Sequence, residues 1–137
     1  MHIGVSTFPT DYSIRAVPLA EALEARGFES LWVVEHTHIP ASRRTPYPLA
    51  PELPSIYWES YEPFTFLAQA AAVTQRLQVG TGVCLVPEHH PITLAKRVAS
   101  LDSLSDGIPL WYWRGLECRG AGEPRRGLCR SLARVAR

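Results

Sequence analysis

A short apolar segment at residues 30–34 constrains the fold more than any other feature of the chain. Its sequence, Ser-Leu-Trp-Val-Val, lacks the polar alternation of a half-exposed strand and is typical of a strand covered on both faces of a parallel sheet. It is preceded by a β-branched stretch at residues 3–7 and by a helical pattern that has Pro18 in its first turn and ends at Gly27. These residues predict a strand–helix–strand unit.

The same alternation continues beyond this unit. Pro63 suits the first turn of a second helix, residues 77–85 are predicted to form a third strand, and a third helix follows Pro91. Three such units predict an α/β fold with a parallel sheet and right-handed crossovers. The segment at residues 35–62 is rich in proline and aromatic residues and shows neither a helical nor a strand period. Connections of this length are usually functional or disordered.

Both doubly wound sheets and (β/α)8 barrels fit this alternation. A dinucleotide-binding start requires GxGxxG after the first strand, whereas residues 4–12 are GVSTFPTDY. Polar and aromatic residues instead follow each predicted strand: Ser6, Thr7 and Phe8, then Glu35, His36 and His38, then Glu88, His89 and His90. Barrel enzymes build their sites at the carboxyl ends of successive strands. We therefore predict the amino-terminal three βα units of an incomplete (β/α)8 TIM barrel.

Four segments resemble the luciferase-like monooxygenase superfamily. They are, in order, GFESLWVVEHTHIP at 27–40, RRTPYP at 43–48, GTGVCLVP at 80–87 and PITLAK at 91–96. The resemblance covers residues 1–106 and is greatest to the oxidoreductases that use coenzyme F420. It implies hydride transfer between coenzyme F420 and an organic small molecule, with FMN as the alternative cofactor and an FMN monooxygenase as the alternative enzyme. It also implies that a complete barrel forms a homodimer.

His36 and Glu35, directly after the second predicted strand, are the candidate catalytic residues. His36 occupies the position of a functional histidine in several F420-dependent enzymes, and an imidazole can exchange a proton with a substrate hydroxyl or carbonyl near neutral pH. Glu35 is expected either to orient His36 or to anchor the loop. The competing interpretation is that His36 is a loop residue hydrogen-bonded to Glu35 or to the backbone.

A second group of residues is predicted to contact the cofactor: Ser6, Thr7, Gly82, Val83 and Cys84. Two glycines in a β-branched strand, Gly80 and Gly82, indicate a bulge or a close approach of the backbone. The resemblance implies a non-proline cis peptide bond at Gly82–Val83, behind the flavin ring. Packing of the barrel is the alternative reason for the glycines, and a buried small hydrophobic residue is the alternative for Cys84. Phe8 is expected on the pocket floor, and Trp58 and Tyr61 on its rim.

A metal site is weighed and not predicted. The segment His36-Thr37-His38 has the HxH spacing, and His89 and His90 could add ligands for a metallohydrolase, but the pattern of Asp and Glu residues gives no support. The three cysteines lack a CxxC spacing, which argues against a disulfide framework and a zinc knuckle. We find no basic–apolar leader at the first residues and no apolar run near the roughly 20 residues of a membrane span. We therefore expect no membrane association and a cytoplasmic protein.

The composition changes near Gly107. Residues 1–106 contain seven basic and eleven acidic residues, whereas residues 107–137 contain seven arginines and two acidic residues. The superfamily continues with LSGGRF, a strand and a GAGWN turn, which this frame lacks. Codons compatible with residues 108–118 encode FLFGIGAGWN when the first base is dropped. We therefore expect a partial barrel domain at 1–106, inactive by itself, and an out-of-frame, disordered tail at 107–137 rather than a nucleic-acid-binding arm.

Overall fold

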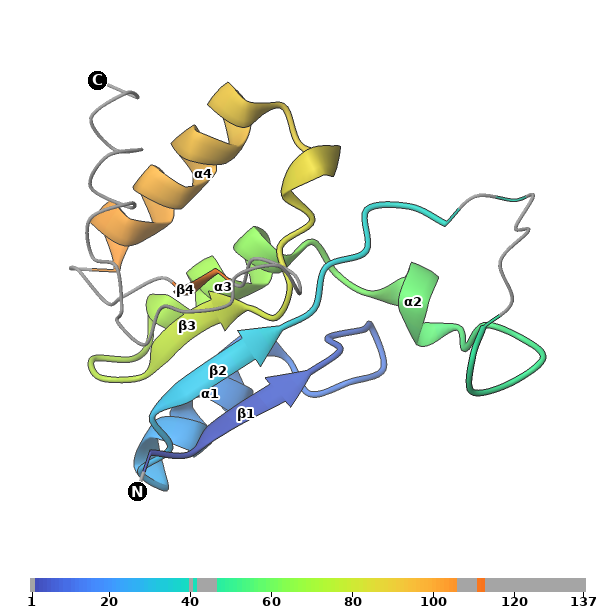
Figure 1. The fold of residues 1–137 in the computed structure, drawn as a ribbon. Coiled ribbons are helices and arrows are strands. Elements are labelled where there is room, and N and C mark those ends of the chain that lie inside the picture. The colour runs from blue at the N-terminus through green and yellow to red at the C-terminus, as the bar shows by residue number, and fades with distance from the viewer. Residues whose placement is uncertain (1, 40, 42–46, 106–110, 113–137) are drawn as a thin grey trace.

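The computed structural model describes residues 2–39, 41, 47–105 and 111–112 of the chain (Figure 1). The elements are β1 (Gly4–Thr7), α1 (Ala16–Ala25), β2 (Ser30–Val33), α2 (Ile56–Glu59), α3 (Pro63–Ala71), β3 (Gln78–Thr81), the 3-10 turn η1 (Val86–Glu88), α4 (Pro91–Leu104) and β4 (Trp111–Tyr112). The predicted alternation of strands and helices is confirmed.

The strands form one parallel sheet in the order β1-β2-β3-β4. Its register aligns Val5, Leu31 and Val79 across the first three strands. Each strand lies beside the strand that precedes it in the chain, as in a barrel, whereas a doubly wound sheet reverses its order at a switch point. The predicted fold class, an incomplete TIM barrel, is confirmed.

One side of the sheet is buried by helices. Alternation along the strands turns Leu31, Val33 and Val79 to this side, where all three are at most 1% exposed and join a core cluster with residues of α1, α3 and α4. Helix α3 packs against both α1 and α4. Burying a leucine or valine side chain stabilises a fold by about 1.5–3 kcal/mol. The helix side therefore holds the strands in register.

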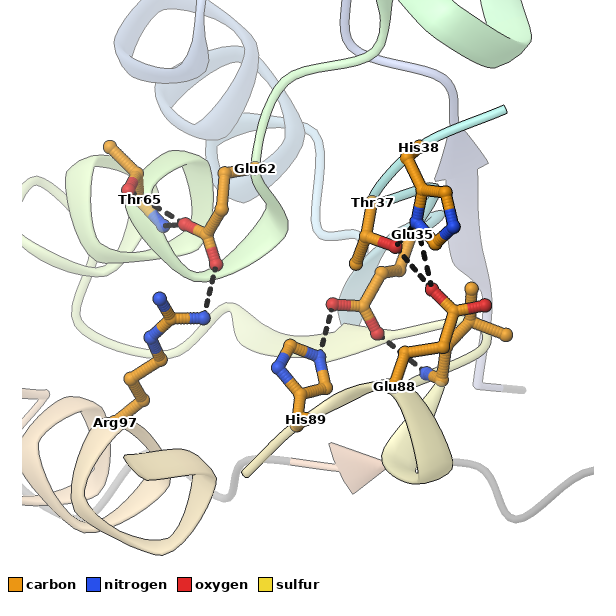
Figure 2. Close-up of polar contacts among 9 residues, drawn as sticks. Glu35, Thr37, His38, Glu62, Thr65, Glu88, His89 and Arg97 are labelled. Atoms are coloured by element: carbon orange, nitrogen blue, oxygen red, sulfur yellow. Dashed lines mark hydrogen bonds and ion pairs between the residues drawn. The ribbon is translucent and has the colours of Figure 1, made fainter. Parts of the chain in front are cut away.

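Local signals account for the helix ends. Helix α3 begins at Pro63, and the carboxylate of its N-cap, Glu62, accepts a hydrogen bond of 2.7 Å from the Thr65 amide. The other oxygen of Glu62 lies 3.6 Å from Arg97 of α4 (Figure 2). After α1, Gly27 has a φ of +75°, the left-handed conformation that glycine adopts without steric cost.

Two observations modify the sequence predictions. The long connection at residues 35–62, expected to lack regular structure, contains the one-turn helix α2. Within the tail at residues 107–137, Trp111–Tyr112 forms β4, which pairs in parallel with β3 and was not expected. The other tail residues lie outside the described part of the chain, so the boundary after residue 106 and the out-of-frame origin stay predictions. No described helix is long and apolar enough to span a membrane.

Candidate functional site

The loops that leave β1, β2 and β3 start at one edge of the sheet because the three strands point the same way (Figure 1). The loop after β2 contains the dipeptide Glu35-His36, and the loop after β3 contains Glu88-His89. Side chains of these two loops contact each other in two places. The expected gathering of polar residues at the carboxyl edge is therefore confirmed.

Glu35 forms the buried contact between the two loops. The residue is 2% exposed, and its Oε1 lies 2.7 Å from His89 Nε2, while its Oε2 accepts a hydrogen bond of 2.5 Å from the Leu85 amide (Figure 2). No hydrogen bond between described residues joins Glu35 to His36. The described contacts of Glu35 thus join it to the loop after β3, and its role in orienting His36 stays a prediction.

His36 instead packs among aromatic rings. Its ring is stacked at 6.1 Å from the ring of Phe8 and meets the edge of Tyr57 at 4.8 Å. Burial lowers the pKa of His36 below its ordinary value, although the charges of Glu88 and Glu35 oppose this shift. A half-buried imidazole that is neutral near pH 7 can either accept or donate a hydrogen bond. His36 is therefore a half-buried imidazole held between Phe8 and Tyr57 at the carboxyl edge of the sheet.

A second contact between the loops is exposed to solvent. The Glu88 carboxylate accepts a hydrogen bond from the Thr37 hydroxyl and lies 3.9 Å from His38 Nδ1 (Figure 2). His38 and His36 therefore have different surroundings, in spite of their HxH spacing. His90, the remaining member of the weighed metal set, is an exposed residue at the N-cap of α4.

The two predicted cofactor residues on β1 lie on opposite sides of the sheet. Ser6 is exposed and aligned with Trp32 on the side away from the helices, whereas Thr7 is half-buried and aligned with Val33 on the helix side. Side chains alternate along a strand, so two neighbouring residues cannot line the same floor. Of the two residues, only Ser6 lies on the side of the sheet away from the helices, called the open side below.

The predicted non-proline cis peptide bond is present at Gly82–Val83. The Gly82 amide donates a hydrogen bond of 2.7 Å to the Val33 carbonyl. A Cβ added at Gly82 would meet Trp32 at 3.6 Å, an ordinary contact, so packing against Trp32 does not require a glycine. The bare backbone is therefore compatible with the close approach of a ligand ring at this position.

Cys84 belongs to the core and not to the open side of the sheet. It is 7% exposed within the core cluster, as the alternative interpretation held. Burial, with a smaller contribution from the Glu35 carboxylate, raises the pKa of the Cys84 thiol to about 12. The thiol is protonated at neutral pH, and the contact of Cys84 with a cofactor stays a prediction. The donor atoms of Glu35, Cys84 and His89 all lie within 4.8 Å of one another.

The two aromatic residues predicted on the pocket rim have different surroundings. Trp58 is 56% exposed, and Tyr61 packs its ring against Phe66 while its amide donates a hydrogen bond of 2.8 Å to the Pro9 carbonyl. Tyr57, the neighbour of His36, was not predicted. Its only sequence signal is its place in an aromatic-rich connection that follows a strand end.

Comparisons with known proteins agree with this geometry. The family model of the luciferase-like monooxygenases matches residues 4–107. An uncharacterized protein of Mycobacterium tuberculosis is 42% identical over 110 residues, which are 78% of this chain and 39% of that protein.

Two solved structures have the same fold. The coenzyme F420 dependent tetrahydromethanopterin reductase from Methanopyrus kandleri has a TM-score of 0.55 at 23% identity, over 78% of this chain and 25% of the reductase. The oxygenating constituent of 3,6-diketocamphane monooxygenase from Pseudomonas putida, solved in complex with FMN, has a TM-score of 0.61 at 18% identity, over 99% of this chain and 37% of that protein. The chain thus spans well under half the length of each of these relatives.

Proposed function

Because the chain belongs to the luciferase-like monooxygenase family, we propose that it is the amino-terminal part of an oxidoreductase that transfers a hydride between coenzyme F420 and an organic small molecule. The observation that carries this proposal is the half-buried His36 between Phe8 and Tyr57 at the carboxyl edge of the sheet. The F420-dependent reductase among the fold neighbours supports this cofactor. The FMN complex among them keeps FMN as the alternative.

The chain contributes position and proton transfer to this chemistry. When bound, a deazaflavin or flavin ring supplies the hydride transfer itself. Gly82 presents bare backbone beside Trp32, where a planar ring can approach closely, and Ser6 offers a hydroxyl on the same open side of the sheet. A ring nitrogen of neutral His36 then accepts the proton of a substrate hydroxyl, and in the reverse reaction the imidazolium returns that proton to a substrate carbonyl.

Glu35 supports the site indirectly. Its hydrogen bonds to Leu85 and His89 tie the loop that follows Gly82–Val83 to the segment that bears His36. A charge-assisted hydrogen bond contributes about 1.5–3 kcal/mol. We therefore assign Glu35 a positioning role, in place of the predicted catalytic one.

We further propose that the 137-residue chain is inactive by itself and that the neighbouring reading frame encodes the rest of the barrel. The described sheet has four strands, whereas a barrel of this type needs eight strands and roughly 250 residues. The family match ends at residue 107, where the composition changes, which supports a shift of frame there.

Two proteins test the proposal: the 137-residue chain, and a protein expressed after dropping the first base of the Ile108 codon. We expect only the frame-restored protein to bind F420, measured by fluorescence, and to transfer a hydride. In that protein His36→Ala should lower kcat/KM by about 10²- to 10⁴-fold, whereas the exposed His38→Ala control should not.

The outcomes separate the alternatives. Binding of FMN without F420 would select the alternative cofactor, and binding of neither by a folded frame-restored protein would contradict the proposed function. Sequencing the genomic DNA across the codons for Ser105 to Pro109 tests the shift of frame directly.

A further inference from the structure

Three side chains of the kinds that bind transition metals converge where β2 and β3 end. They are the carboxylate of Glu35, the thiol of Cys84 and the imidazole of His89, and their donor atoms lie within 4.8 Å of one another. The side chains of Glu35 and His89 are 1% and 9% exposed, and Cys84 is buried. We propose that these three residues form a binding site for one zinc ion. This inference does not depend on the proposed oxidoreductase function.

The donor set selects the kind of metal. One oxygen, one nitrogen and one sulfur match the ligands that Zn²⁺ takes in proteins, whereas Mg²⁺ and Ca²⁺ require oxygen ligands. A sulfur ligand also favours borderline-soft ions over hard ones. Three protein ligands leave the fourth tetrahedral position to a water molecule.

The present distances require only small movements. With metal–ligand bonds of about 2.0–2.3 Å, a tetrahedral zinc site holds its ligand atoms about 3.3–3.7 Å apart. The Glu35 and His89 donor atoms are now 2.7 Å apart and must separate by about 1 Å or less. Donor atoms that are now as much as 4.8 Å apart must approach each other by about 1 Å. The Leu85 amide remains bonded to the other carboxylate oxygen and orients the carboxylate, as hydrogen-bond donors behind metal ligands do.

The charges at this position favour a cation. Within the described part of the chain, His89 is the one basic group within ion-pair distance of the buried Glu35 carboxylate. No described lysine or arginine offsets that charge. The Cys84 thiol lies beside this carboxylate, with its Sγ within 4.8 Å of the Glu35 and His89 donor atoms. A bound Zn²⁺ would displace the thiol hydrogen and offset the charges of both the carboxylate and the resulting thiolate.

The test uses the 137-residue chain itself. Cys118→Ser and Cys129→Ser remove the tail thiols, so that Cys84 is the single remaining cysteine. The chelator-treated chain is titrated with Zn²⁺ by calorimetry and with Co²⁺ by absorption. We expect one ion per chain, a sulfur-to-cobalt charge-transfer band in the near ultraviolet, and a rise in Tm of at least about 5 °C with saturating Zn²⁺.

Matched variants assign the ligands. Cys84→Ser should abolish the charge-transfer band, and His89→Gln and Glu35→Gln should each weaken Zn²⁺ binding at least about tenfold. The exposed neighbour His90→Gln should leave affinity unchanged. Circular dichroism checks the fold of each variant, and Cys84→Ala and Glu35→Asp replace a variant that unfolds. The absence of saturable binding, the absence of the charge-transfer band, or equal affinity in the folded Cys84 and His89 variants would overturn the site.

Discussion

The loops after β2 and β3 each carry a Glu-His dipeptide, yet the two dipeptides have opposite environments. Glu35 is buried and bonded to His89 of the other loop, whereas Glu88 is partly exposed and bonded to Thr37 of the first loop. The glutamates thus pair across the loops and not with their own neighbours. His36, the remaining histidine of the two dipeptides, lies against Phe8 and Tyr57.

Because each glutamate bonds to the opposite loop, the two histidines have different surroundings. A histidine bonded to a buried carboxylate is held in one orientation, as His89 is. A histidine packed against rings, with no hydrogen bond to another described residue, can offer its nitrogens to a ligand, as His36 can. Two sequence-equivalent histidines are therefore not equivalent candidates for catalysis.

The largest expected effect follows from removing the buried carboxylate. Glu35→Ala leaves the Leu85 amide and the His89 imidazole without their partner, and it should lower the free energy of unfolding by about 3–5 kcal/mol. Urea unfolding followed by circular dichroism measures this change. Glu88→Ala is the matched control and should cost less than about 1 kcal/mol. Equal losses for the two glutamates would remove the contrast between the loops.

Substitution of His89 should destabilise the fold more than substitution of His36. His89→Ala should lower the free energy of unfolding by about 1.5–3 kcal/mol, because it leaves a buried carboxylate with one fewer donor. His36→Ala removes edge and stacking contacts with aromatic rings and should cost about 0.5–1.5 kcal/mol. The same urea titration compares them. If His36→Ala were the more damaging variant, His36 would be the structural histidine of the pair.

The exposed link between the loops should contribute little. Thr37→Val removes the hydroxyl that donates to Glu88, at a position that is exposed to solvent. Water can replace this partner, so the loss of unfolding free energy should be at most about 1 kcal/mol. The neighbouring ion pair of Glu88 with His38 is also exposed, and high salt should weaken it further. Thermal unfolding in low and high salt checks this. A loss as large as that of Glu35→Ala would show that the contact between Thr37 and Glu88 stabilises the fold as much as the buried one does.

The smallest effect concerns the titration of His36. Burial lowers its pKa from the ordinary value of 6.5, so the unfolded chain binds the proton first as the pH falls. The stability that neutral His36 contributes is therefore present above pH 6.5 and is lost as the pH falls through the lowered folded pKa.

NMR titration of the imidazole signals measures this pKa. Tyr57→Ala exposes the ring and should raise the pKa of His36 toward its ordinary value, whereas Leu49→Ala, at an 82% exposed position, should not change it. A His36 pKa at or above 6.5 in the unsubstituted chain would contradict the burial argument.

Much of the fold was predictable because its signals are local. The apolar segment of β2 predicted a covered strand, Pro63 and Pro91 predicted where two helices begin, and Gly27 predicted where one helix ends. Gly80 in β3, Gly82 just after it and the family resemblance together located the cis bond at Gly82–Val83. Helix α2 escaped prediction because four residues are too few to show a helical period.

The site was less predictable because its contacts join distant residues. The sequence by itself determined which residue types follow each strand, and so placed Glu35, His36 and His89 at one edge of a parallel sheet. The tertiary structure alone decided that Glu35 bonds to His89, 54 positions away, that Tyr57 packs on His36, and that Cys84 turns into the core. These pairings depend on strand register and on which face each side chain takes, and a shift of one residue reverses that face.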